Sequence, residues 1–322
     1  MTSKPARRLS NDFLARAALA CCLAGSLWLA GCEKAESASA SSTAPSAEAQ
    51  ASQAAESAGL LVTLGGDVTE IVFALGEGPR VAGSDRGSLY PPQVHALPRL
   101  DYHRQMSAEG ILSLEPEMVL LTAEAGPPTA IEQLRSAGVK VVTVPAEASV
   151  EGAEAKIRAV AEALDATEKG DALIAAMRAD LAAARDRVAQ TEERPAVLFV
   201  YARAGQGAAM VAGENSPAET MIELSGGRNA ASGFEGFKPL TPEAMLEFNP
   251  DVVLMLDKGF EAIGGEEGLM GLPGMAETTA ARKGRFVTLP DNLLLSFGPR
   301  LAEAVARLSD ALHPAAGATT GG

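Results

Sequence analysis

Cysteine is nearly absent from this 322-residue chain, and aromatic side chains are scarce. All three cysteines, Cys21, Cys22 and Cys32, lie in the first tenth of the sequence. The remainder can therefore hold neither a disulfide framework nor a thiolate metal cluster. Aromatic residues make up only 4% of the chain, which argues against a sugar-binding site built from stacked rings. Three dispersed histidines are also too few for a convincing zinc or manganese site.

Basic residues are outnumbered by acidic ones, 27 against 41, which gives a formal net charge of −14. A nucleic-acid-binding protein needs a basic surface to neutralise phosphates, so we expect no nucleic acid partner. The chain also lacks the Gly-x-Ser-x-Gly, His-Glu-x-x-His and phosphate-loop motifs, which argues against an enzyme. Its hydrophobic content of 47% is nevertheless sufficient to form substantial cores.

Residues 1–31 have the pattern of a secretory signal peptide, with basic residues before the apolar run Ala17–Ala30. That run is shorter than the roughly 20 residues that a membrane-spanning helix needs. It ends in Leu-Ala-Gly-Cys at Cys32, similar to the cleavage box of bacterial lipoproteins, so we expect Cys32 to carry lipid. An ordinary cleaved signal with an incidental Cys32 is the alternative. Residues 32–58, mostly Ala, Ser, Glu, Gln and Thr, predict a disordered tether, and residues 315–322 a flexible tail.

Two patterns recur, in the same order, in the two halves of the remaining chain. Residues 106–121 and 240–255 share Ser/Thr-x-Glu-x-x-Leu-x-x-x-Pro-acid-x-Val-Leu. This predicts a short helix with a hydroxyl at its N-cap, a proline stop and then a buried parallel strand. Residues 67–76 and 216–225 form the second pair, each interpreted as a capped helix start with an apolar stripe. Two repeats predict two similar lobes.

Short apolar runs alternate with helical patterns in each half, which predicts α/β lobes with parallel sheets covered by helices. The expected strands are Leu60–Leu64, Met118–Thr122, Val139–Val144, Ala196–Tyr201, Val252–Leu256 and Arg285–Leu289.

The lobes are expected over residues 59–167 and 193–314. Between them, residues 168–192 contain no proline, and no glycine after Gly170, which predicts one long linker helix. Such a linker would restrict hinge motion between the lobes. A ligand site is expected in the cleft between them, because open α/β sheets bind ligands outside the carboxyl ends of their strands.

Four stretches carry a family resemblance: residues 64–76, 97–110, 237–241 and 295–300. Through them the chain resembles the substrate-binding proteins of bacterial ABC importers, in the class with a rigid helical linker. The first stretch fits siderophore, cobalamin and haem binders alike. The second contains Tyr-x-Arg-x-x-Ser-Ala-Glu-Gly, which is narrower and is similar to the periplasmic haem-binding proteins.

The resemblance implies a transport protein without enzymatic activity. It would capture haem b (Fe-protoporphyrin IX) in the interlobe cleft and deliver it to a membrane permease and its ATPase. The resemblance also implies a monomer in the periplasm, and the Leu-Ala-Gly-Cys box at Cys32 implies that it is anchored to a membrane as a lipoprotein. Binding of a siderophore or of cobalamin on the same scaffold is the alternative.

In the haem-binding family, the tyrosine before the Ser-Ala-Glu-Gly helix ligates the haem iron and the arginine two residues later supports it. By position these residues are Tyr102 and Arg104. A phenolate suits ferric iron, and iron together with a guanidinium favours the deprotonated form. In an extended loop the Tyr-x-Arg spacing places both side chains on one side, and His103 points away into a supporting or surface position. A loop aromatic that covers the lobe is the alternative role for Tyr102.

In the second lobe, Arg203 and Arg228 are candidates for contact with the haem propionates, although Arg228 could instead be a helix-end cation. Some family members carry a histidine there that ligates haem, whereas residues 201–210 contain none. One five-coordinate haem iron is therefore expected. Tyr90, in a proline-rich loop, suits a packed position, and Tyr201 suits the core or the cleft wall.

Glu109 and Glu243 occupy matching positions in the repeated helix, one in each lobe. The resemblance implies that such a pair docks on arginines of the permease, with contacts that set orientation. The alternative is that each glutamate only completes the first turn of its helix.

Overall fold

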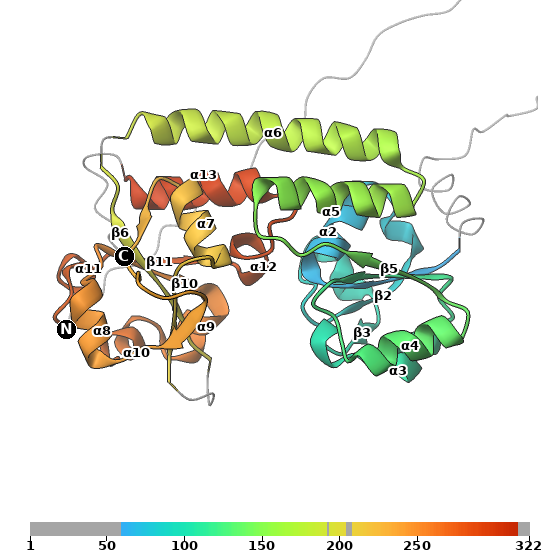
Figure 1. Ribbon diagram of the computed structural model, residues 1–322, viewed down its shortest axis with the longest axis horizontal. Coiled ribbons are helices and arrows are strands. Elements are labelled where there is room, and N and C mark those ends of the chain that lie inside the picture. Colours follow the sequence, from blue (N-terminus) through green and yellow to red (C-terminus); the bar gives the residue numbers. More distant parts are fainter. Residues whose placement is uncertain (1–58, 192, 204–207, 315–322) are drawn as a thin grey trace, which may run out of the picture. The chain divides into compact units, whose positions relative to one another are not determined.

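A computed structural model describes residues 59–191, 193–203 and 208–314. The expected signal peptide, Cys32, the tether and the C-terminal tail lie outside the described residues. The first lobe begins at β1 and ends with α5, and the second lobe begins at β6 and ends with α13 (Figure 1). None of the described helices is both long and apolar enough to cross a bilayer.

The first lobe contains a sheet of parallel strands in the order β3-β2-β1-β4-β5. The central strand β1 and its neighbour β4 are buried along their whole length, as continuous apolar runs require. Leu61 of β1 pairs with Met118 of β4 in an unbroken register. The strands are β1 (Leu61–Leu64), β2 (Val81–Asp85), β3 (Arg99–Leu100), β4 (Met118–Thr122) and β5 (Lys140–Val144). The helices are α2 (Gly66–Ala74), η1 (Gly78–Arg80), η2 (Pro92–Ala96), η3 (His103–Gln105), α3 (Ala108–Leu112), α4 (Pro128–Ser136) and α5 (Val150–Ala163).

The second lobe contains a sheet in the order β11-β10-β6-β7-β9, with β8 beside the start of β6. Strands β11, β10, β6 and β8 run parallel as expected, whereas β7 and β9 are added antiparallel. The strands are β6 (Ala196–Tyr201), β7 (Met210–Ala212), β8 (Arg228–Asn229), β9 (Phe237–Pro239), β10 (Val252–Leu256) and β11 (Phe286–Leu289). The helices are α7 (Pro217–Leu224), α8 (Pro242–Phe248), α9 (Asp257–Ala262), α10 (Gly265–Met270), α11 (Thr279–Lys283), α12 (Asp291–Leu294) and α13 (Leu301–Leu312).

The first sequence repeat is confirmed in detail. The hydroxyl of Ser107 accepts a hydrogen bond from Gly110 N at 3.3 Å and begins α3. Thr241 does the same for Ala244 N at 3.2 Å and begins α8. Each helix is followed by a fully buried strand, β4 or β10.

The second repeat is confirmed only in part. Ser216 caps α7 through its hydroxyl, which accepts a hydrogen bond from Glu219 N at 3.2 Å. Helix α2 has no side-chain cap, and the expectation of one is wrong. The residue before α2 is Gly65, whose φ of 116° lies in a region open to glycine.

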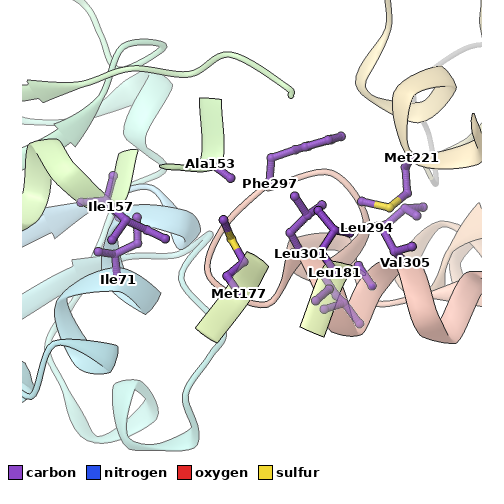
Figure 2. Packing of buried hydrophobic residues seen from close by; sticks show 14 of the residues in the cluster. Ile71, Ala153, Ile157, Met177, Leu181, Met221, Leu294, Phe297, Leu301 and Val305 are labelled. Atoms are coloured by element: carbon purple, nitrogen blue, oxygen red, sulfur yellow. The ribbon is translucent and has the colours of Figure 1, made fainter. Parts of the chain in front are cut away.

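The long linker is helix α6 (Thr167–Ala189), which packs on both α5 and α13 (Figure 1). One hydrophobic cluster includes residues of both lobes and the buried face of α6. Figure 2 shows Met177 and Leu181 of α6 in this cluster with Ile157 of the first lobe and Leu301 of the second. The two lobes therefore share a hydrophobic core as well as a helix, an arrangement that would oppose hinge motion between them.

Candidate functional site

A cavity of about 470 Å³ is lined by residues of both lobes. Its walls include residues within two positions of the carboxyl ends of parallel strands: Gly65 after β1, Glu124 after β4, Arg203 after β6 and Asp291 after β11. This is the location that the parallel-strand argument gives for a ligand site. We call it the interlobe cavity.

A smaller cavity of about 290 Å³ shares three lining residues with the interlobe cavity. We call it the tyrosine cavity. It is lined by Tyr102, His103, Arg104, Gln105 and Arg203. Tyr102 and Arg203, predicted from different lobes, therefore line one space.

Tyr102 lies between β3 and the short helix η3, and its residue is 53% exposed. Its carbonyl accepts a hydrogen bond from Gln105 N at 2.7 Å, which closes a tight turn. The turn leaves the phenol accessible to a ligand. A packed aromatic that covers the lobe would be far less exposed.

The expectation of an extended loop through Arg104 is wrong, because His103–Gln105 forms the 3-10 helix η3. Strict alternation of side chains therefore does not place Tyr102 and Arg104 on one side of the chain. Arg104 is exposed and forms an ion pair with Glu124. Both residues line the interlobe cavity, so this guanidinium is at the site but already has an acidic partner.

His103 is held by Asp85 at the end of β2. Its Nδ1 lies 3.2 Å from Asp85 Oδ2, and its main-chain N–H donates to the same oxygen at 3.4 Å. Its Nε2 is buried and has no hydrogen-bond partner among the described residues. His103 thus lines the site, and its Nδ1 is held in place by Asp85.

The Asp85 carboxylate is fully buried and organises the turns around it. Its Oδ1 accepts hydrogen bonds from Ser88 Oγ at 2.6 Å and from Gly65 N at 3.2 Å. Burial alone would raise the pKa of Asp85, but the hydrogen bonds from His103, Ser88 and Gly65 outweigh it and hold this pKa below its usual value. Asp85 is therefore ionised and joins the α2 and η3 turns.

The second-lobe wall of the interlobe cavity includes Tyr201, Arg203 and Phe237. The Arg203 guanidinium lies 5.2 Å from the centre of the Tyr201 ring. Among the described residues Arg203 forms no ion pair with a carboxylate, although its charge acts on Asp291 of the same wall.

Arg228 lies elsewhere. It pairs with Ala196 at the start of β6, whereas Tyr201 is at the other end of that strand. It lines neither cavity. The structure therefore does not bring Arg228 to the site, because β8 pairs with the end of β6 that faces away from it.

The junction between the lobes carries two ion pairs on α2, one to α5 and one to the C-terminal region. Lys156 Nζ lies 2.9 Å from Asp67 Oδ2 and donates to the Ser296 carbonyl at 2.7 Å. Arg300 Nε and Nη2 donate to the two oxygens of Glu70 at 2.9 and 2.7 Å. Burial raises the pKa of Glu70, although the hydrogen bonds and charge of Arg300 oppose the shift.

Asp291 contributes an acidic group to the second-lobe wall. Its Oδ1 is buried without a hydrogen-bond partner among the described residues. Burial raises the pKa of Asp291, while Lys258 and Arg203 act in the opposite direction. The second-lobe wall thus carries both an acid whose pKa is raised and the cation of Arg203.

Glu109 and Glu243 are both exposed and lie in the first turns of α3 and α8. Neither lines the cavities nor forms an ion pair among the described residues. Their carboxylates are accessible on the surface of each lobe.

Sequence reasoning missed Asp85, Lys156 and the Glu70–Arg300 pair. Arg300 lies in the resembling stretch 295–300, and Glu70 in the stretch 64–76, but no local pattern joins residues so far apart in the chain. Among the described residues, no group of three or more His, Cys, Asp and Glu side chains could hold a metal ion.

Comparison with known proteins gives a family match. The family described as "Periplasmic binding protein" matches residues 61–293. The periplasmic heme-binding protein RhuT from Roseiflexus sp. RS-1 is 43% identical, with a TM-score of 0.77 over 79% of this chain and 98% of that one. The periplasmic heme-binding protein BhuT, solved with two hemes, is 44% identical, with a TM-score of 0.75 over the same shares.

Curated relatives are more distant. The uncharacterized ABC transporter substrate-binding lipoprotein YvrC of Bacillus subtilis is 28% identical over 79% of this chain and 80% of its own. A cobalamin-binding protein of Halobacterium salinarum is 27% identical over 79% of this chain and 69% of its own.

Proposed function

The chain belongs to the periplasmic binding protein family, and we propose that it captures haem between its lobes for an ABC importer. The observation that carries this proposal is the exposed phenol of Tyr102 at a cavity completed by the other lobe. The heme-binding proteins RhuT and BhuT, both above 40% identity over nearly their whole length, support the same ligand.

In the proposed complex the phenolate oxygen of Tyr102 ligates the ferric iron of haem b. Tyrosine is an established haem ligand, and a phenolate is a hard anionic donor. His103 stands beside this ligand, fixed by the ionised Asp85. Arg104 contributes positive charge at the same site, tempered by its ion pair with Glu124.

Arg203 is the proposed partner of a haem propionate. It lines both cavities and forms no ion pair with a carboxylate among the described residues. Guanidinium groups bind carboxylates through paired hydrogen bonds, which fixes the ligand's orientation as well as its charge. We leave Arg228 out of the proposed site because it lies at the far end of β6.

Delivery to the permease would require a surface that remains free when haem is bound. We propose that Glu109 and Glu243 dock on cations of the permease, which acts with its ATPase. Their exposure on matching helices of the two lobes supports a two-point contact. We further propose that the protein works as a monomer in the periplasm, tethered through lipid on Cys32 and the segment 32–58 after removal of residues 1–31.

Hemin titration of the mature protein, followed by absorbance, tests the proposal. We expect a high-spin ferric-tyrosinate spectrum that saturates at one equivalent. Tyr102→Ala should abolish or strongly weaken that spectrum. Tyr90→Ala removes another exposed tyrosine, which lines neither cavity, and should leave the spectrum intact.

Three outcomes would contradict parts of the proposal. An unchanged Tyr102→Ala spectrum would remove Tyr102 as ligand. Saturation at two equivalents would overturn the single-haem proposal. BhuT, which was solved with two hemes, is the relevant comparison. Tight binding of cobalamin without binding of hemin would favour the alternative that the cobalamin-binding relative represents.

A further inference from the structure

Two large hydrophobic residues that are exposed among the described residues line the cavities, and they come from opposite lobes. Tyr102 belongs to the first lobe, and Phe237 of the second lobe is 42% exposed on the wall of the interlobe cavity. Tyr102 has a proposed role as iron ligand, whereas Phe237 has none so far. An exposed phenyl ring in a cavity lined by many polar groups requires an explanation.

The Phe237 ring is held in place by other aromatic rings. It packs edge-on against Phe199 and Tyr201, with both pairs of ring centres 6.3 Å apart and interplanar angles of 77° and 70°. Phe199 is fully buried in the sheet, which anchors the group from below. The remaining surface of Phe237 is therefore presented to the cavity in a fixed position on strand β9.

A fixed aromatic surface of this kind suits a flat apolar ligand. Covering it removes apolar area from water, and ring-on-ring contact adds to that gain. A small polar ligand would leave the ring wet and gain nothing from it. The nearby guanidinium of Arg203, 5.2 Å from the Tyr201 ring, supplies a cation at the edge of the aromatic group.

We propose that Phe237 is the second-lobe wall that contacts the porphyrin plane on the face opposite Tyr102 and keeps a sixth ligand from the iron. The inference rests on the proposed function and assigns a specificity-determining residue to the same site. Phe237 recognises the porphyrin plane on one face of haem, and Tyr102 recognises the iron on the other face.

Metal-free protoporphyrin IX separates these two kinds of recognition. Its binding, followed by fluorescence, should weaken about tenfold or more in Phe237→Ala, as expected for loss of an aromatic contact. Hemin binding should weaken by a similar factor. Tyr102→Phe should weaken hemin binding but leave metal-free porphyrin binding nearly unchanged.

The matched control is Leu246→Ala, which removes an exposed apolar side chain of the same lobe that lines neither cavity. It should bind both porphyrins like the wild type. Phe237→Leu, which keeps apolar area but loses the flat ring, should fall between the wild type and Phe237→Ala, and circular dichroism checks that each variant is folded. The residual hemin complex of Phe237→Ala should gain a six-coordinate spectrum as water reaches the iron.

Each outcome has a definite reading. If Phe237→Ala binds metal-free porphyrin with wild-type affinity, the proposed contact of Phe237 with the porphyrin is wrong, whereas the proposed function is unaffected. A wild-type protein that binds neither porphyrin would overturn the proposed function, and the wall with it. Loss of metal-free porphyrin binding in Tyr102→Phe to the same extent as in Phe237→Ala would refute the division of roles between the two faces.

Discussion

Replacing Arg300 by alanine should destabilise the junction between the lobes severely. Arg300 donates two hydrogen bonds to Glu70, at 2.9 and 2.7 Å, and its guanidinium lies 3.7 Å from the centre of the Tyr90 ring. The Glu70 side chain is only 2% exposed. In the variant its carboxylate keeps one side-chain hydrogen bond, from Asn292 Nδ2 at 3.1 Å, and loses its counter-ion.

The expected loss of unfolding free energy is about 3–5 kcal/mol at neutral pH, the range for breaking a buried ion pair by removing one partner. The pH dependence follows from Glu70. Burial raises the folded-state pKa of Glu70 above 4.5, and Arg300 opposes that shift, so removal of Arg300 raises this pKa further. A raised carboxyl pKa stabilises the fold at pH below the unfolded value, and the contribution is lost as pH rises through the folded value. The deficit of the variant should therefore shrink as the pH is lowered.

Urea denaturation of the wild type and of Arg300→Ala, followed by circular dichroism at several pH values, measures this loss. Arg307→Ala is the matched control, because its partner Glu303 and Arg307 itself are about half exposed, at 45% and 50%. An exposed pair contributes at most about 1 kcal/mol. Glu70→Gln in the Arg300→Ala background should recover much of the loss by removing the unpaired charge. A loss near that of Arg307→Ala, or a deficit that grows toward acid pH, would refute the reasoning.

Three other substitutions test the remaining structure. Gly65→Ala should lower the thermal midpoint of unfolding more than Gly138→Ala does. Both glycines have positive φ, but only at Gly65 would the new Cβ also meet neighbouring atoms at 3.0–3.2 Å. Equal shifts of the two midpoints would contradict this prediction. Asp85→Asn should lower the free energy of unfolding by about 1.5–3 kcal/mol at neutral pH. Because the folded-state pKa of Asp85 lies below its usual 3.8, this difference from the wild type should fade in urea titrations as the pH drops through and below that value. A difference that stays constant with pH would contradict this prediction. Leu181→Ala, in the core shared by both lobes, should lose about 2–5 kcal/mol yet unfold in one calorimetric transition, whereas two separated transitions would show that the lobes do not share a cooperative core.

The fold could be predicted from the sequence because its signals are local. The buried strands β4 and β10 are continuous apolar runs after a capped helix and a proline, and the repeat of that pattern predicts two lobes. Helix α6 is a long run without helix breakers. By contrast, β7 and β9 are only three residues long, and their antiparallel pairing depends on the sheet they join.

The site was predictable only where a motif carries it. Tyr102 was predictable from a family motif and Arg203 from its place after a strand, and both residues line one cavity. The turn at His103 replaced the expected extended chain because Asp85, from another strand, holds both the main chain and the ring of His103. Phe237 lies in the resembling stretch 237–241, but its position depends on Phe199 and Tyr201 beside it, which only the folded sheet brings together.

A crystal structure of the protein grown with hemin would test the central claim most directly. We expect one haem between the lobes, with the phenolic oxygen of Tyr102 coordinated to its iron. Haem bound through another side chain, or a Tyr102 phenol directed into solvent while haem lies elsewhere, would contradict it.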